Sequence, residues 1–206
     1  MKQIHPASET GRAIVPVGRS GIEIRSRAGV SAKAGSGCVV LAIDCSGSMA
    51  GSKMEQARRG AVEFAEAAMG NGYAVGLVQF ASTTSVACGL QTDLGALGEH
   101  AGRLEAGGST DMTGGIGLAA SLTAGVSGPR SMVVITDGLP TKRRTALEAA
   151  ERAVRDSVQV ITIGTGDADE GFPAQSASGD QLTKMVKNSD LAEGIASSAA
   201  LLPGSI

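Results

Sequence analysis

An apolar run that stops at an aspartate constrains this chain more than any other feature. Residues 39–43 read Val-Val-Leu-Ala-Ile, and Asp44 follows at once. Such a run is typical of a strand that is buried on both faces of a parallel sheet. A similar run at 132–136, Met-Val-Val-Ile-Thr, leads into Asp137. The sequence therefore predicts two buried strands, each of which brings a carboxylate to its carboxyl end.

The rest of the chain alternates strand-like and helix-like segments. Further strands are predicted at 74–80, 85–90 and 158–164, and helices at 52–70, 93–105, 113–124, 141–156, 182–186 and 191–202. This alternation predicts an α/β fold with a doubly wound, mostly parallel central sheet and helices on both faces. Because the link at 81–84 is too short for a parallel crossover, segment 85–90 is predicted to be an antiparallel edge strand.

Two helix starts carry capping signals. Ser52 and Glu55 have the spacing of a capping box, and Asp93 precedes the helix predicted at 93–105. The side chains of Ser and Asp accept hydrogen bonds from the free N–H groups of a first helical turn. We therefore expect Ser52 and Asp93 to be the N-caps of their helices.

The chain divides into a short extension and one domain. Residues 37–206 are long enough for a core that needs no disulfide or metal to hold it. Residues 1–36 are less regular, with two short strands predicted at 13–17 and 22–27 and a small-residue linker at 31–37. This N-terminal extension is predicted to be either an appended β-hairpin or a flexible tail.

Composition excludes several partners. Lys and Arg total 18 against 20 for Asp and Glu, so charge gives no reason to expect nucleic acid. No window approaches about 18 apolar residues, so no membrane span is expected. The N-terminus shows no signal region, and the three cysteines have no zinc-like spacing and are expected to be reduced core thiols. These features together favour a cytoplasmic location.

Oxygen-bearing side chains gather around the two strand ends. Asp44, Ser46 and Ser48 form an Asp-x-Ser-x-Ser cluster, Thr110 lies in a Gly-Gly-Ser-Thr loop, and Asp137 lies in Ile-Thr-Asp-Gly. Hard divalent cations such as Mg²⁺ prefer carboxylate and hydroxyl oxygens. Ligands of doubly wound sheets bind where the strand order reverses, so the two carboxylates face one crevice if their strands are neighbours. These five residues are the predicted metal site.

The five positions, in this order, resemble the metal-ion-dependent adhesion site of von Willebrand factor type A domains. The resemblance covers about residues 37–202 and implies the Rossmann-like fold of that family. It implies that Ser46 and Ser48 bind the cation directly, that Thr110 binds it directly or through water, and that Asp44 and Asp137 hold metal-bound waters. The cation would be Mg²⁺, with Mn²⁺ and Ca²⁺ as alternatives.

The resemblance also implies a partner. The open coordination position would take an Asp or Glu of another protein, so the chain would be a protein-interaction module and not an enzyme. Stand-alone bacterial domains of this kind often act as adaptors beside ATPases or stress-response systems.

Three residue groups near the motif carry expectations of their own. The thiol of Cys45 is too soft a ligand for Mg²⁺ and is expected to point into the core. Asp111, next to Thr110, is expected to be an exposed charge that leads a helix. A group of glycines is expected to let that helix approach the sheet closely: Gly114, Gly115 and Gly117.

Two other functions remain open. Asp44 could be the nucleophile of a Mg²⁺-dependent phosphohydrolase, as in haloacid-dehalogenase-type sites. Those sites want a second aspartate where this chain has Ser46, and no lysine is obviously placed to balance a transferred phosphate. Neither His5 nor His100 pairs visibly with a nucleophile, which disfavours Ser-His-Asp chemistry. The third interpretation is a scaffold whose metal site is vestigial.

Overall fold

The computed structural model describes residues 37–138, 140–166 and 175–204. Six strands form one sheet in the order β3-β2-β1-β4-β5-β6. They are β1 (Cys38–Asp44), β2 (Ala74–Phe80), β3 (Thr84–Gln91), β4 (Arg130–Thr136), β5 (Val158–Thr165) and β6 (Thr183–Val186). Only the β2–β3 pair is antiparallel among these strands. The predicted sheet with one antiparallel edge strand is confirmed, whereas the predictions for residues 1–36 lie outside the described residues.

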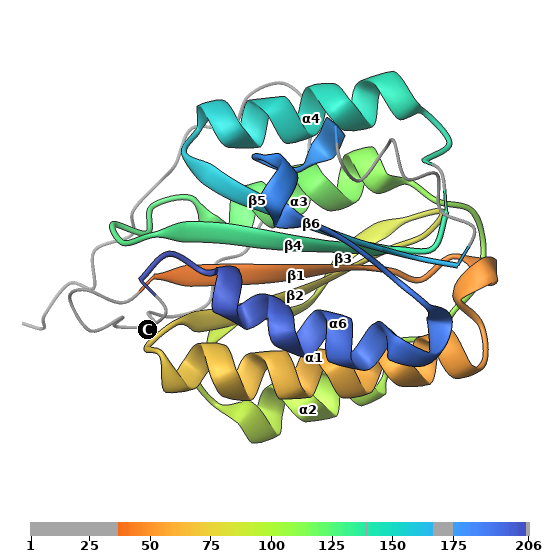
Figure 1. Ribbon diagram of the computed structural model, residues 1–206, viewed down its shortest axis with the longest axis horizontal. Helices are drawn as coiled ribbons and strands as arrows, with labels where there is room; N and C mark the ends of the chain where they lie inside the picture. The colour runs from red at the N-terminus through yellow and green to blue at the C-terminus, as the bar shows by residue number, and fades with distance from the viewer. Residues whose placement is uncertain (1–36, 139, 167–174, 205–206) are drawn as a thin grey trace, which may run out of the picture.

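Helices cover both faces of the sheet (Figure 1). One layer contains α3 (Met112–Thr123) and α4 (Arg143–Arg155), and the other contains α1 (Ser52–Gly70), α2 (Leu94–Gly102) and α6 (Leu191–Ser197). Short 3₁₀ turns complete the described part: η1 (Gly47–Met49), η2 (Asp180–Leu182), η3 (Asn188–Asp190) and η4 (Ser198–Leu201). Within these described residues, no helix is long and apolar enough to cross a membrane.

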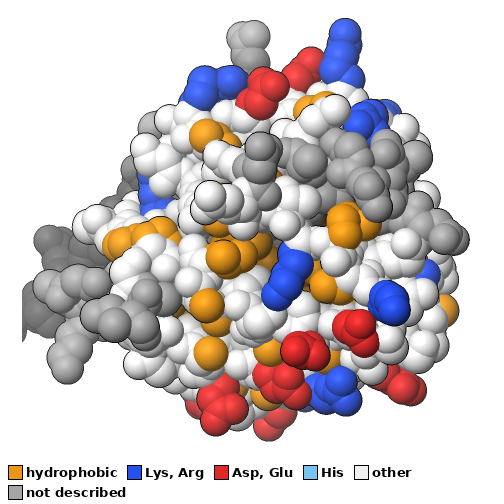
Figure 2. Space-filling model, viewed as in Figure 1, with side chains coloured by type: hydrophobic (Ala, Val, Ile, Leu, Met, Phe, Trp, Pro, Cys, Tyr) orange, Lys and Arg blue, Asp and Glu red, His pale blue; other side chains and the backbone are white. Residues whose placement is uncertain are grey.

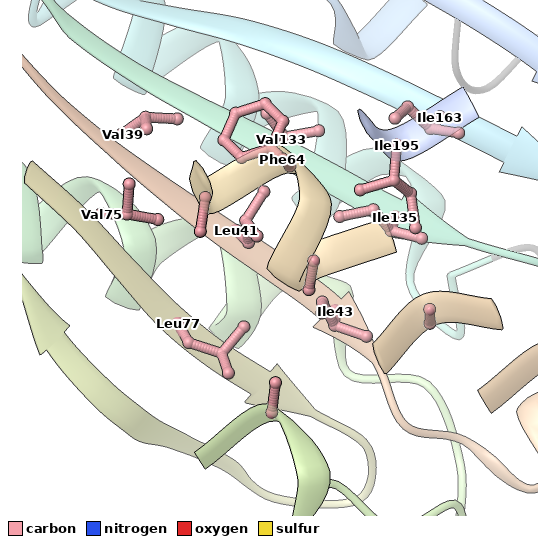
Figure 3. Packing of buried hydrophobic residues seen from close by; sticks show 14 of the residues in the cluster. Val39, Leu41, Ile43, Phe64, Val75, Leu77, Val133, Ile135, Ile163 and Ile195 are labelled. Carbon is pink, nitrogen blue, oxygen red and sulfur yellow. The ribbon is translucent and has the colours of Figure 1, made fainter. Parts of the chain in front are cut away.

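The central strand β1 packs against both helical layers. Its residues alternate between two buried clusters, with Leu41 and Ile43 on the α1 side and Val40 and Ala42 on the α3 side. On the α1 side, Phe64 lies over the strands and is fully buried (Figure 3). Since every residue of β1 is buried, the strand needs apolar side chains on both faces. That requirement explains the run in the sequence.

The strand order reverses between β1 and β4. The chain leaves β1 for α1 on one face of the sheet and leaves β4 for α4 on the other. The parallel register aligns Ile43 with Ile135, so Asp44 lies beside Thr136 and Asp137 follows at the same rim. The predicted arrangement of the two carboxylates at a topological switch point is confirmed.

Two local predictions are wrong. Residues 183–186 form the strand β6, which pairs in parallel with β5, and not a helix. Pairing with β5 outweighs the weak helical pattern of so short a segment.

Ser52 is not an N-cap: the cap residue is Gly51, with φ of +74°, and no side chain caps α1. Ser52 is therefore already helical. The other predicted cap is confirmed, because Asp93 accepts a hydrogen bond from the Ala96 N–H at 3.1 Å.

The close approach expected of α3 occurs at two of its three glycines, Gly114 and Gly115. A Cβ on Gly115 would lie 2.5 Å from the Phe80 ring, so a side chain there would push α3 away from β2. A Cβ on Gly114 would lie 2.6 Å from Thr84 Oγ1. At Gly117 nothing lies within 4 Å, so the expectation is wrong there.

Charges on the surface are mixed. On the face seen in Figure 2, most acidic side chains lie toward the lower edge, where Figure 1 shows α1 and α2, others lie at the top, and basic side chains are scattered over the whole face. This face therefore shows no continuous basic stripe, in agreement with the near balance of Lys and Arg against Asp and Glu. A basic stripe would be the footprint of a nucleic-acid-binding surface.

Candidate metal centre

Asp44 organises the loop that follows β1. Its side chain is completely buried. Asp44 Oδ1 accepts a hydrogen bond from the Ser46 N–H at 2.8 Å, and Oδ2 accepts one from Thr136 Oγ1 at 2.7 Å. The carboxylate therefore joins the loop after β1 to the end of β4.

Backbone hydrogen bonds hold this loop on its other side. Cys45 N–H donates to the Phe80 carbonyl of β2 at 2.8 Å, and Gly107 N–H donates to the Cys45 carbonyl at 2.7 Å. Gly47 N–H donates to the Gly108 carbonyl at 3.0 Å. Two different segments, the end of β2 and residues 107–108, therefore hold the backbone of the loop that carries the serines.

The segment that carries Thr110 is held by the backbone contacts of Gly107 and Gly108 with the loop after β1, and by further contacts of its own. Gly108 has φ of +81°, and a Cβ there would lie 2.4 Å from Ser82 Oγ, so the position requires glycine. Ser109 N–H donates to Ser82 Oγ at 3.0 Å. The Thr110 carbonyl accepts hydrogen bonds from the N–H and the hydroxyl of Thr141 at 3.3 and 3.0 Å. The backbone of this segment thus lies beside the loop after β1.

Hydroxyl groups connect the two strand ends. Ser46 Oγ and Ser48 Oγ are 3.1 Å apart, and Ser48 Oγ donates to Asp137 Oδ1 at 2.7 Å. Four of the five predicted residues therefore form one connected network. Thr110 lies on the adjoining segment, and its hydroxyl makes no hydrogen bond to any residue in the described ranges.

The network has a buried floor and an open side. Asp44, Ser46 and Asp137 are all buried. Ser48 is exposed and Thr110 is half-buried. An external group could therefore approach the hydroxyls from solvent, whereas the carboxylates lie beneath them.

Lys53 also belongs to this site, although the sequence analysis assigned it no role. Its Nζ lies 2.5 Å from Asp137 Oδ2, so a lysine that the sequence pattern did not point to lies beside one of the two carboxylates. A signal for it was present in the sequence, because Lys53 opens a helix. A cation in a first helical turn opposes the helix dipole and is therefore unusual without a separate partner.

Burial shapes the electrostatics of the site. Desolvation raises the pKa of Asp44 above its ordinary value of 3.8, and the nearby Asp137 charge raises it further. Hydrogen bonds from Ser46 and Thr136 act in the opposite direction and do not cancel the effect. A positive charge close to Asp44 would lower this raised pKa, because it favours the ionised carboxylate.

Cys45 and Asp111 have the roles expected of them. Burial raises the pKa of the Cys45 thiol to about 12, and the residue packs in the hydrophobic core, as expected. Asp111 is exposed and caps α3 by accepting a hydrogen bond from the Gly114 N–H at 3.2 Å. All three cysteines are free and buried, as predicted.

The donor set fits a hard divalent cation. It contains two carboxylates and the hydroxyls of Ser46, Ser48 and Thr110, all of them oxygen ligands. The described part of the chain holds no cluster of three or more His, Cys, Asp or Glu side chains of the kind that binds a metal without hydroxyl ligands. Mg²⁺ suits such a set, because it binds through few carboxylates and keeps several waters.

The family model of the von Willebrand factor type A domain matches residues 39–197. No curated protein sequence matches the chain.

Solved structures have the same fold. The vWF domain of the type V pili tip protein Mfa5 from Porphyromonas gingivalis is 12% identical, with a TM-score of 0.75 over 81% of this chain and 94% of that one. The conserved hypothetical protein BatB from Bacteroides thetaiotaomicron is 20% identical, with a TM-score of 0.69 over 80% and 98%. Proximal thread matrix protein 1 from the mussel byssus, with zinc in its MIDAS motif, is 17% identical, with a TM-score of 0.64 over 81% and 48%.

Proposed function

The chain belongs to the von Willebrand factor type A domain family, and from this premise we propose that it is a metal-dependent protein-interaction module. Domains of this family generally mediate protein–protein interactions, often through a divalent cation. The proposed ligand is an Asp or Glu side chain of a partner protein. The proposed cation is Mg²⁺, with Mn²⁺ and Ca²⁺ as alternatives.

One observation carries this proposal: the connected network of carboxylates and hydroxyls at the rim. Ser46 and Ser48 would bind the cation directly, and Thr110 would bind it directly or through water. Asp44 and Asp137 would hold its waters. When bound, the cation supplies a coordination position for an external carboxylate oxygen. The exposed Ser48 and the half-buried Thr110 lie on the side that such a carboxylate would approach.

Contacts of Asp44 favour binding over phosphoryl transfer. As a nucleophile, Asp44 would need a free carboxylate oxygen facing the substrate. Both of its oxygens accept hydrogen bonds, from Ser46 N–H and Thr136 Oγ1, and the residue is completely buried. Turnover of phosphate esters that Asp44→Asn abolishes would nevertheless establish the phosphohydrolase.

Metal binding is tested by thermal unfolding of the wild type, Ser48→Ala and Ser52→Ala. Ser52 is a matched control, because it is an exposed serine close to the loop and its side chain makes no hydrogen bond to any described residue. A ligand at 100 times its Kd stabilises the folded state by about 2.7 kcal/mol. We expect Mg²⁺ or Mn²⁺ to raise the Tm of the wild type and Ser52→Ala but not that of Ser48→Ala. An equal rise in all three proteins would contradict the assigned site.

Partner binding is tested by a pull-down from lysate of the source organism. The baits are the wild type in Mg²⁺, the wild type in EDTA, Asp44→Ala in Mg²⁺ and Ser52→Ala in Mg²⁺. We expect one protein to be retained by the first and last baits only, and substitution of its acidic residues to abolish retention. Equal retention by all four would place the interface elsewhere and favour a scaffold with a vestigial metal site.

The same pull-down tests the proposed setting. By resemblance to stand-alone bacterial domains, we propose a cytoplasmic partner that belongs to an ATPase or stress-response system. Identification of the retained protein by mass spectrometry decides this point without assuming it. A partner from the cell surface would contradict the cytoplasmic assignment and leave the metal-dependent interaction intact.

A further inference from the structure

The Lys53–Asp137 ion pair differs from the other ion pairs recorded among the described residues. The others join residues i and i+4 of one helix, at 3.5 to 3.7 Å and with exposed side chains. Lys53 instead reaches from α1 to the end of β4, where the Asp137 side chain is 0% exposed. Exposed pairs contribute little to stability, whereas a buried charge left without a partner is strongly destabilising. Lys53 therefore supplies the positive charge that balances Asp137 inside the site.

This ammonium takes a place that the proposed cation would need. Asp137 Oδ1 accepts a hydrogen bond from Ser48 Oγ at 2.7 Å, and Oδ2 faces Lys53 Nζ at 2.5 Å. Both oxygens of the carboxylate are thus engaged. A dication held by Ser46 and Ser48 would lie near the ammonium, and like charges at such separations repel strongly.

From these contacts, and resting on the proposed function, we infer that Lys53 is a tethered counter-cation that a divalent metal must displace from Asp137. Without metal, the ammonium neutralises Asp137 and keeps the site folded. In a metal-bound state, the Lys53 ammonium would leave Asp137 Oδ2, since a bound dication would supply the balancing charge. Lys53 is thereby a positioning residue that lowers the affinity of the site for metal.

A second position for the ammonium lies close by on the same rim. A point at the Cβ position of Gly166 is 3.5 Å from Lys53 Nζ and 3.1 Å from Asn188 Oδ1. Asn188 Oδ1 accepts a hydrogen bond from Thr165 Oγ1 at 2.9 Å. Since an amide oxygen has two lone pairs, Asn188 can accept a second hydrogen bond from the displaced ammonium. The Lys53 side chain is 21% exposed, so water also remains within its reach.

Metal affinity measured by calorimetry tests the inference. Mg²⁺ and Mn²⁺ are titrated separately into metal-free wild type, Lys53→Met and Lys184→Met. Lys184 is the matched control, because its Nζ donates to Ser197 Oγ and not to a carboxylate, while its loss changes the net charge equally. We expect Lys53→Met to bind Mn²⁺ more tightly than the wild type by about tenfold or more. Lys184→Met should match the wild type.

The outcomes separate the two proposals. Equal affinities of the wild type and Lys53→Met, or weaker binding by Lys53→Met, would overturn the counter-cation and leave the metal site in place. Binding by none of the proteins, Lys53→Met included, would overturn the metal-dependent function itself. Binding by Lys53→Met alone would support the inference in its strongest form.

A measurement on the wild-type chain covers the case in which Lys53→Met does not fold. In ¹⁵N-detected lysine spectra, the Lys53 ammonium should be protected by its contact with Asp137 and give a separate signal, assigned with Lys53→Arg, which keeps the positive charge. Addition of Mg²⁺ should shift or remove this signal and leave that of Lys184 unchanged. A Lys53 signal that stays constant while backbone signals of Ser46 and Ser48 respond to Mg²⁺ would overturn the displacement.

Discussion

Asp44 and Asp137 stand at the ends of two neighbouring strands, yet the fold compensates their charges differently. Asp44 accepts hydrogen bonds from neutral donors, the Ser46 N–H and the Thr136 hydroxyl, and burial raises its pKa. Asp137 is paired with the Lys53 ammonium and with the Ser48 hydroxyl. Strand position decides that both carboxylates are buried. The neighbouring segments decide how each charge is compensated: neutral hydrogen-bond donors face Asp44, and a charged side chain of α1 faces Asp137.

The largest effect is expected at Lys53, because its loss leaves the buried Asp137 charge unpaired. In EDTA, Lys53→Met should lower the free energy of unfolding by about 3 kcal/mol. Adding Asp137→Ala to this variant should restore much of the loss. The measurement is urea unfolding at pH 7, with Lys184→Met as the control, since Lys184 Nζ donates to Ser197 Oγ. A loss below 1 kcal/mol would show that the pair contributes no more than a surface pair does.

At Asp44, the free energy of unfolding should depend on a neutral hydrogen-bond donor, the Thr136 hydroxyl. Thr136→Val removes the hydroxyl that donates to Asp44 Oδ2 and should cost about 2 kcal/mol, because a buried carboxylate loses a hydrogen bond. Chemical unfolding in EDTA measures the loss. The control is Thr83→Val at an exposed position, where a change below about 0.5 kcal/mol is expected. Equal effects of the two substitutions would contradict the role of Thr136.

Neutralising Asp44 itself should instead raise the free energy of unfolding of the metal-free protein. Asp44→Asn keeps an oxygen acceptor for the Ser46 N–H, and Thr136 Oγ1 can instead donate to the Gly138 carbonyl, 3.2 Å away. The metal-free protein should gain on the order of 1 kcal/mol at pH 7, because a buried charge disappears. Its stabilisation by metal should disappear as well. Unfolding curves with EDTA and with Mg²⁺ measure both changes.

The pH dependence of Asp44→Asn checks the cause of this gain. The folded pKa of Asp44 is raised, so its contribution to stability is fully present below the ordinary pKa of 3.8 and is lost as the pH rises through the folded pKa. The advantage of Asp44→Asn over the wild type should therefore grow with pH across this interval and then stay constant. An advantage that is independent of pH from 4 to 8 would argue against burial of a charge as its cause.

The smallest effect on stability is expected at Ser48, which connects the two carboxylate environments. Ser48→Ala removes the contacts to Asp137 and Ser46. Because Ser48 is exposed, water can replace these contacts, and the metal-free protein should lose only about 0.5 kcal/mol. A loss near that of Lys53→Met would show that Ser48 holds Asp137 in place as much as Lys53 does.

The sequence predicted the strands around the site well, because their patterns are local and strong. The runs that became β1, β2, β4 and β5 were recognised from their apolar residues, and the aspartates from their place after two of them. The prediction failed for β6, whose four residues carry almost no periodic signal. It also failed for the cap of α1, because Gly51, with a positive φ, takes the N-cap position that the sequence pattern gave to Ser52.

The sequence by itself determined the sheet, the burial of its central strands and the group of oxygen donors at the rim. Those features follow from local sequence patterns, namely short apolar runs and the polar residues directly after them. Only the tertiary structure decided which donors meet: Ser48 with Asp137, Thr136 with Asp44, and Lys53 with Asp137. Such contacts join residues that lie far apart in the chain, so they depend on the register between β1 and β4 and on where α1 begins. The charge balance of the site is therefore a property of the folded chain.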